Sequence, residues 1–91
     1  MMNEETFAIG QLVATPGALD LAKNGINLAA YLRRHMSGDW GDLCDEDKRS
    51  NDTAVSNGTR IFSAYETEEG KLWIITEADR SVTTFLLPSE Y

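Results

Sequence analysis

The first apolar segment of the chain spans residues 7–14, with the sequence FAIGQLVA. Apolar side chains occur at both odd and even positions, so a strand formed here would be apolar on both faces. Thr15 and Pro16 follow directly. Threonine before proline is typical of a helix start, because proline lacks the N–H that the first helical position leaves unbonded. We therefore predict a strand that leads straight into a helix.

Two short helices are predicted after this strand. The first ends at Asn24 and Gly25, where glycine adopts the left-handed conformation readily. Asn27 can cap the second helix, residues 28–36, in which apolar side chains recur at spacings of three and four. The predicted buried stripe of the second helix contains Leu28, Tyr31, Leu32 and His35.

The segment 34–52, RHMSGDWGDLCDEDKRSND, holds the only histidine, one of the two tryptophans and six carboxylates. The two glycines of GDWG permit a sharp turn of the backbone. Asp42, or Asp45 one turn later, can cap a third helix that ends at Gly58. Acidic residues at a helix start also suit the positive end of its dipole. Cap and turn roles thus account for the whole of RHMSGDWGDL, which we interpret primarily as a structural joint.

The last third of the chain has the pattern of strands. Residues 60–67, 71–77 and 82–87 are rich in β-branched and aromatic side chains and are separated by the short turns EEG and ADRS. This spacing predicts an antiparallel meander. The segment KLWIIT is apolar on both faces, which favours a central position in the sheet. Pro88 should end the last strand, because proline cannot donate to a ladder.

The order β-α-α-α-β-β-β predicts an α+β fold, with the helices packed on one face of a small antiparallel sheet and the first strand at an edge. Residues 1–91 are expected to form a single domain, with 1–6 disordered. The second face of the sheet is partly apolar as well. It can be covered by another copy of the chain in a homodimer, or it can stay semi-exposed on a monomer.

Composition narrows the class of protein. A hydrophobic share of 42% and a charged share of 25% are typical of a folded soluble protein. The chain lacks a run of about 18 apolar residues that could span a bilayer, and its start lacks the basic and apolar parts of a secretory signal. We therefore expect a cytoplasmic protein without membrane contact. The single cysteine, Cys44, cannot form an internal disulfide, and we expect it to be a small buried hydrophobe.

The charge is distributed unevenly along the chain. Acidic and basic residues balance in residues 1–36, and the whole net charge of −7 lies in residues 37–91. Proteins that grip phosphate backbones usually carry the opposite sign, so we do not expect direct binding of nucleic acid. Solubility is the simplest consequence of the negative charge. A basic surface on a protein partner is the complementary target.

Three segments, GQLVATPGAL, RHMSGDWGDLCDEDKRSND and WIITEADRSVTTFLLPSEY, resemble a family of small bacterial proteins associated with plasmids and other mobile elements. The resemblance covers nearly the whole chain. It implies a plasmid-related bacterial protein, but the family has no established activity and supplies no catalytic residue. Some members carry a restriction-system label, which does not transfer, because 91 residues cannot hold a methyltransferase or nuclease subunit.

The segment 34–52 offers residues for two kinds of chemistry. His35, Asp39, Asp42 and Cys44 are all metal-binding residue types, but the paired spacings of known zinc sites are missing, so we predict no metal and no cofactor. His35 with Asp39 or Asp42 can form an oriented general base. The simpler interpretation is a histidine at a helix end, bonded to a loop carboxylate or to the last carbonyls of the helix. No nucleophile is identifiable, so no catalytic residue is assigned.

Three other side chains have a structural and a binding interpretation. Trp40 can seal the core or offer a stacking surface. Asn51 should point inward on the stripe of the third helix, with His35, Arg34 or the GDWG backbone as its partner. Arg80 can form a local ion pair in its turn or neutralise the acidic surface. The candidate binding residues are therefore His35, Asp39, Trp40, Asp42, Asn51 and Arg80.

The sequence is compatible with two functions. The first is a non-catalytic accessory protein that acts through its acidic surface on a basic protein partner. The alternative is a small enzyme or small-ligand binder centred on residues 35–51.

Overall fold

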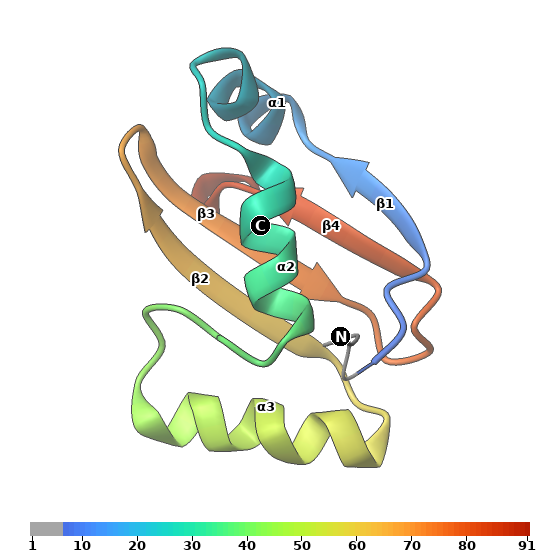
Figure 1. Cartoon of the computed structure of the whole chain (residues 1–91). Helices are drawn as coiled ribbons and strands as arrows, with labels where there is room; N and C mark the ends of the chain where they lie inside the picture. The colour runs from blue at the N-terminus through green and yellow to red at the C-terminus, as the bar shows by residue number, and fades with distance from the viewer. Residues whose placement is uncertain (1–6) are drawn as a thin grey trace.

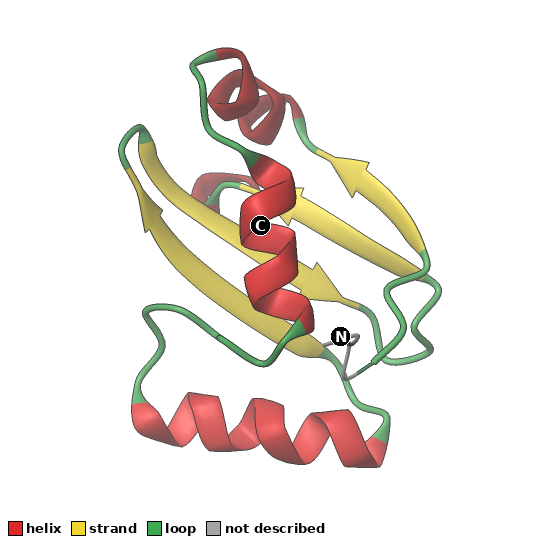
Figure 2. Ribbon diagram, in the orientation of Figure 1, coloured by secondary structure: helices red, strands yellow, loops and turns green. Residues whose placement is uncertain are grey.

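The computed structural model of the chain describes residues 7–91, so the expected disorder of residues 1–6 lies outside the described part. The predicted order of elements and the α+β class are confirmed (Figure 1, Figure 2). The elements are β1 (Gln11–Ala14), α1 (Pro16–Lys23), α2 (Leu28–Met36), α3 (Asp45–Asn57), β2 (Ile61–Thr67), β3 (Gly70–Thr76), β4 (Val82–Leu86) and the 3-10 helix η1 (Pro88–Glu90). Within residues 7–91, no helix is long and apolar enough to cross a membrane.

The four strands form one sheet in the order β1-β4-β3-β2. β2, β3 and β4 form the predicted antiparallel meander, with β3 in the interior. β1 lies at an edge as predicted, but it pairs with β4 in parallel, so the sheet is mixed rather than antiparallel. This direction places the start of α1 beside η1, where the Glu90 carboxylate accepts hydrogen bonds from the Thr15 hydroxyl and the Gly17 N–H.

β1 is shorter and more exposed than its apolar sequence suggested. It begins at Gln11 because Gly10 adopts a left-handed φ of 63°, and a Cβ there would lie 2.4 Å from the backbone of Ser81. The strand has apolar side chains on both faces, as its sequence indicates, but Leu12 and Val13 are exposed rather than buried. An edge strand has a neighbour on one side only, which leaves its side chains open to solvent.

The first two helices begin where the sequence indicated. The Thr15 hydroxyl accepts a hydrogen bond from the Ala18 N–H, and Asn27 Oδ1 accepts one from the Ala30 N–H. These bonds satisfy N–H groups that have no partner inside a helix.

The predicted cap of α3 is wrong. Cys44 occupies the N-cap position and makes no side-chain cap bond, whereas Asp42 lies outside the helix and Asp45 is its first residue. The Asp42 N–H donates to the Ala64 carbonyl at 2.6 Å, which ties Asp42 to β2 instead. As a surface N-cap, Cys44 is exposed, and the expectation that it is buried is also wrong.

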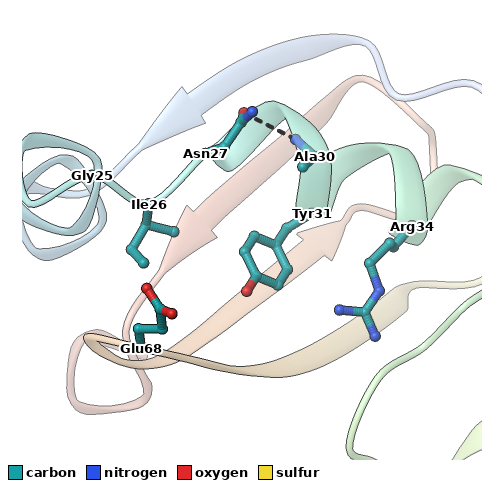
Figure 3. Close-up of a pocket in the computed structure, with 7 residues that line it drawn as sticks. All are labelled: Gly25, Ile26, Asn27, Ala30, Tyr31, Arg34 and Glu68. Carbon is teal, nitrogen blue, oxygen red and sulfur yellow. Dashed lines mark hydrogen bonds between the residues drawn. The ribbon is translucent and has the colours of Figure 1, made fainter.

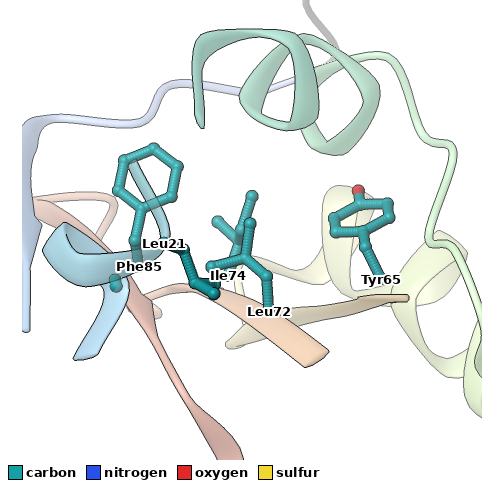
Figure 4. Packing of buried hydrophobic residues seen from close by; sticks show 6 residues of the cluster. Leu21, Tyr65, Leu72, Ile74 and Phe85 are labelled. Carbon is teal, nitrogen blue, oxygen red and sulfur yellow. The ribbon is translucent and has the colours of Figure 1, made fainter. Parts of the chain in front are cut away.

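The main core lies between the sheet and helices α1 and α2 (Figure 1). Figure 4 shows Tyr65, Ile74 and Phe85 projecting from the sheet toward the helices. Leu72 and Ile74 are completely buried there. The partly buried side chains that pack against this core include the predicted stripe residues Leu28, Tyr31 and Leu32 of α2.

α3 does not share the face covered by α1 and α2. It lies beside β2, and a second apolar cluster of Trp40, Ala54 and Ile61 joins it to the rest of the molecule (Figure 1). Phe7, Leu43 and Val55 pack around this cluster as partly buried neighbours. Residues 7–91 therefore contain two separate clusters of buried apolar residues, and the smaller one holds α3.

The other face of the sheet is covered in part by its own aromatic side chains. Trp73 packs edge-on against Phe62 at 4.8 Å and against Tyr91 at 5.6 Å between ring centroids. Ile75 is only 3% exposed beneath them. A shallow apolar cavity of about 310 Å³ remains between these side chains and Arg60.

Candidate functional site

His35 lies in the last turn of α2 and is completely buried. Its Nδ1 is 2.5 Å from Ser63 Oγ on β2, and its Nε2 is 2.9 Å from Thr76 Oγ1 on β3. The expected partners, a loop carboxylate or the last helix carbonyls, are therefore wrong. Burial lowers the pKa of His35 from 6.5 to about 4, so the imidazole is neutral near pH 7.

A chain of hydroxyl groups fixes the tautomer of His35. The Thr83 hydroxyl donates to the Ile9 carbonyl at 2.7 Å, so the bond between Thr83 and Thr76, also 2.7 Å, must use the hydrogen of Thr76. Thr76 Oγ1 then accepts from Nε2–H of His35. Nδ1 is left as an acceptor for the Ser63 hydroxyl. Each group in the chain from Ser63 to the Ile9 carbonyl thus donates to the next one.

This polar network is sealed from solvent. Ser63, Thr76 and Thr83 are completely buried, and the rings of Phe7 and Trp40 lie edge-on to His35, with centroid distances of 5.3 and 5.9 Å. A general base must reach the proton that it removes from a substrate. The geometry of His35 is that of a satisfied core histidine which fastens α2 to the sheet.

Trp40 and Asn51 are buried as predicted, with exposures of 4% and 5%. Trp40 seals the smaller cluster, and its Nε1–H donates to Asp52 Oδ1 at 2.9 Å. The predicted partners of Asn51 are wrong: its side-chain amide bonds the backbone of Phe62 on β2. Both residues thus help to attach α3 to the edge of the sheet.

Arg80 binds backbone carbonyl groups that the sequence did not indicate as its partners. It adopts a left-handed φ of 61° in the β3–β4 turn, and its guanidinium donates to the carbonyls of Thr59, Ala54 and Glu77 at 2.7, 2.9 and 3.1 Å. None of the ion pairs within residues 7–91 involves Arg80, so the predicted local ion pair is wrong. Arg80 instead binds carbonyls near the end of α3, where a cation is favoured.

Asp39 and Asp42 are the two candidate residues that face solvent. Asp39 Oδ2 accepts from Arg34 Nε at 2.7 Å, and this hydrogen bond is the main cause of a lowered Asp39 pKa. The structure therefore separates the six candidates: three are buried, Arg80 binds backbone, and the two aspartates lie on the surface. Within residues 7–91, no three His, Cys, Asp or Glu side chains are grouped so that they could hold a metal ion.

The sequence did not indicate a cleft that lies between α2 and the β2–β3 turn (Figure 3). Its volume is about 450 Å³, Tyr31 and Arg34 extend from α2 toward β2, and Glu68 lies on the β2–β3 turn. The Arg34 guanidinium lies over the ring of Tyr65 at 4.7 Å, while Asp39 holds its Nε. This support presents the remaining guanidinium N–H groups in a fixed position, suited to a carboxylate or phosphate.

Four exposed carboxylates lie on the loop before α3 and on its first turn. We call this group the acidic surface, and it consists of Asp42, Asp45, Glu46 and Asp47. Within the described part of the chain, none of these four forms an ion pair. The acidic surface therefore keeps its charge available to another molecule.

Comparison of the chain with protein-family models, curated proteins and solved structures finds no match. The resemblance to a plasmid-associated family consequently stays a prediction.

Proposed function

We propose that this protein is a non-catalytic interaction protein that binds a basic region of a protein partner through the acidic surface. The observation that carries the proposal is the group of exposed carboxylates without an ion pair within residues 7–91. Complementary charge between two proteins mainly raises the rate of association and selects the partner. A cytoplasmic location and an association with a plasmid belong to the same proposal and rest on sequence alone.

The attachment of α3 supports this role because a rigid helix presents its charges in a constant arrangement. Asn51 bonds to β2, Asp52 bonds to Trp40, and Arg80 bonds to the Ala54 carbonyl near the other end of the helix. These contacts hold α3 at three of its residues. Pre-organised charges lose little conformational entropy when a partner binds.

The buried state of His35 supports the non-catalytic part of the proposal. Its two ring nitrogens are occupied by Ser63 and Thr76, and its low pKa leaves it neutral. The histidine that the sequence offered as a general base therefore serves the fold. Direct binding to nucleic acid is disfavoured by the same carboxylates, which repel phosphate groups.

Two double variants with equal loss of charge test the proposal. Glu46→Gln with Asp47→Asn removes half of the acidic surface, and Glu68→Gln with Glu69→Gln removes two charges from the β2–β3 turn as the control. Each protein is immobilised and exposed to host lysate, and retained proteins are identified by mass spectrometry. We expect basic nucleic-acid-handling proteins on the wild type and the control, and a loss of them on the first variant.

The association rate of a captured partner should also fall steeply with added salt, because exposed charges are screened. An equal loss of partners on both double variants, or a rate that salt does not change, would exclude the acidic surface as the binding site.

A second candidate function is the binding of a small anionic ligand in the cleft of Arg34. The sequence suggested a ligand site within residues 35–51, part of which is buried. The cleft is open instead, and its Arg34 guanidinium lies over the rings of Tyr31 and Tyr65. Titration with inorganic phosphate and acetate, followed by NMR of the Tyr31 ring, provides the test. Arg34→Gln should remove the response and Arg33→Gln, an exposed neighbour outside the cleft, should keep it.

A further inference from the structure

The outer edge of β1 has open backbone groups. Gln11 and Thr15 donate their N–H groups to Ser81 and Phe85 carbonyls on the β4 side, each at 3.0 Å. Backbone groups of alternate residues in a strand point in opposite directions, so those of Leu12 and Ala14 point away from the sheet. Within residues 7–91, these outward groups bond to no other residue.

Exposed apolar side chains lie on this strand and on the helix that follows it. Leu12 is 46% exposed, Val13 39% and Leu19, on α1, 50%. They are three of the four large apolar side chains that are exposed in the described part of the chain. Residues 7–19 contain no charged side chain, although the whole chain carries −7. An uncharged open strand with apolar side chains is a surface on which another strand can pair.

The opposite edge of the sheet is closed by the chain itself. Asn51 bonds to the Phe62 backbone, and the segment around Gly41 pairs with Ala64 of β2 in parallel. The sheet of residues 7–91 therefore has one closed edge, at β2, and one open edge, at β1. A molecule with one open edge can join one further strand, which limits the assembly to a closed pair.

We propose that β1 pairs with β1 of a second copy of this chain, in antiparallel orientation about a two-fold axis, so that the two sheets become one. A second copy is the occupant that the surface fits best, because it supplies an uncharged open edge of equal length. Two-fold pairing brings the same exposed residues together from both sides, so Leu12 and Val13 of each copy are covered by the other.

The charge distribution agrees with this mode of pairing. The strand order places β1 at one end of the sheet and β2, with the acidic α3 beside it, at the other. With strands about 4.8 Å apart, seven spacings separate the two β2 strands of the dimer by roughly 34 Å. This is several times the screening length of about 8 Å at physiological salt. The edge strands meet where the repulsion between two acidic chains is weakest.

The other apolar surface, the sheet face around Trp73, is less open. Tyr91 and Phe62 pack on Trp73, and Ile75 is buried beneath them. A dimer formed through that face would first have to displace these side chains. The experiment must therefore distinguish a dimer formed through this face from a dimer formed through β1.

Sedimentation velocity over a wide range of protein concentration tests the pairing on the whole chain. The 10.1 kDa monomer should convert to a species of twice that mass as concentration rises. Added salt should change the dimer little, because its two acidic ends lie several screening lengths apart. Leu12→Pro removes only an outward N–H and should weaken dimerisation at least about tenfold relative to Leu12→Ala, which keeps that N–H. Circular dichroism checks the fold of both.

Amide exchange on the wild type tests the same pairing without a variant. The amides of Leu12 and Ala14 should become protected as concentration rises, whereas those of Gln11 and Val13, bonded within the sheet, should be protected throughout. A monomer at every concentration, or equal exchange of Leu12 at low and high concentration, would overturn the proposal. A dimer that Leu12→Pro leaves intact and Trp73→Ser abolishes would also overturn it, because that result assigns the interface to the sheet face around Trp73.

Pairing through β1 does not involve the acidic surface. Glu46→Gln with Asp47→Asn should leave dimerisation intact, and Leu12→Pro should leave the capture of basic partners intact. Each proposal can therefore fail while the other stands.

Discussion

The side-chain amide of Asn51 makes the two hydrogen bonds to Phe62 that a neighbouring strand would make. Its Nδ2 donates to the Phe62 carbonyl at 2.6 Å, and its Oδ1 accepts from the Phe62 N–H at 3.2 Å. One helical side chain thus satisfies a donor and an acceptor on the edge of β2, and it fixes the position of α3 relative to the sheet.

Asn51→Ala should lower the free energy of unfolding by about 1–3 kcal/mol, because two partly buried backbone groups lose their partner. Urea unfolding measures the loss. Ser50→Ala, on the exposed side of the same helix, is the matched control and should change stability by less than about 0.5 kcal/mol. Equal effects of the two variants would show that the Asn51 bonds contribute nothing specific.

His35 makes stability depend on pH in a defined window. The folded protein keeps His35 neutral down to about pH 4, whereas the unfolded chain takes up a proton near pH 6.5. The unfolded state therefore binds more protons between these values, and stability is lost as pH falls from 6.5 toward 4. The shift corresponds to about 3 kcal/mol. The measurement is the free energy of urea unfolding across this range.

His35→Gln provides the comparison, because glutamine can donate and accept hydrogen bonds but does not titrate in this range. The variant will be less stable at pH 7, and its stability should change less between pH 6.5 and 4 than that of the wild type. A wild-type profile that is flat between these pH values would contradict the buried, neutral state of His35.

Arg80 should tolerate substitution poorly although it lies in a surface turn. Arg80→Lys keeps the charge but cannot bond the carbonyls of Thr59, Ala54 and Glu77 with one planar group, so we expect a loss of about 1–3 kcal/mol. Arg33→Lys, on the exposed side of α2, is the control and should be near neutral. Thermal unfolding compares the stability of the two variants. Equal stability would show that the hydrogen bonds of Arg80 to these carbonyls do not stabilise the fold.

Gly41 and Gly58 form a natural pair for testing close packing. Both have a left-handed φ, 79° and 73°, but a Cβ on Gly41 would lie 2.0 Å from the Ala64 carbonyl oxygen, whereas a Cβ on Gly58 meets nothing within 4 Å. Gly58→Ala should therefore show only backbone strain, about 1 kcal/mol. Gly41→Ala should be at least about 2 kcal/mol worse, because β2 must also move. Equal losses in urea unfolding would contradict the close approach.

The parts of the fold that follow from neighbouring residues were predictable. Thr15 and Asn27 cap helices within three residues of themselves, and the β2–β3–β4 meander follows from short turns between apolar segments. The start of α3 was not predicted correctly, because Asp42 bonds to a strand 22 residues further along the chain. Local preference for an aspartate cap was outweighed by that tertiary bond.

The candidate site was less predictable than the fold. The sequence correctly indicated that Asn51 and Trp40 point inward, but it did not reveal the partners of His35, which lie 28 and 41 residues away. Arg80 reaches Ala54 across 26 residues. The partners of His35 and Arg80 come close only when distant strands and helices meet in the fold. The spacing of nearby residues therefore cannot predict these contacts.

The way in which α3 is attached affects how the molecule opens. The helix is held by the small cluster around Trp40 and by a few polar contacts, whereas the main core of Leu72 and Ile74 lies elsewhere. We therefore expect α3 to detach in a local unfolding event of lower free energy than global unfolding. Detachment of α3 together with the segment around Gly41 would expose the edge of β2 while the sheet remains intact. A molecule with two open sheet edges can pair with a neighbour at each edge, so the assembly does not close. Conditions that release α3 should therefore lead to fibrous aggregates that grow by addition of strands.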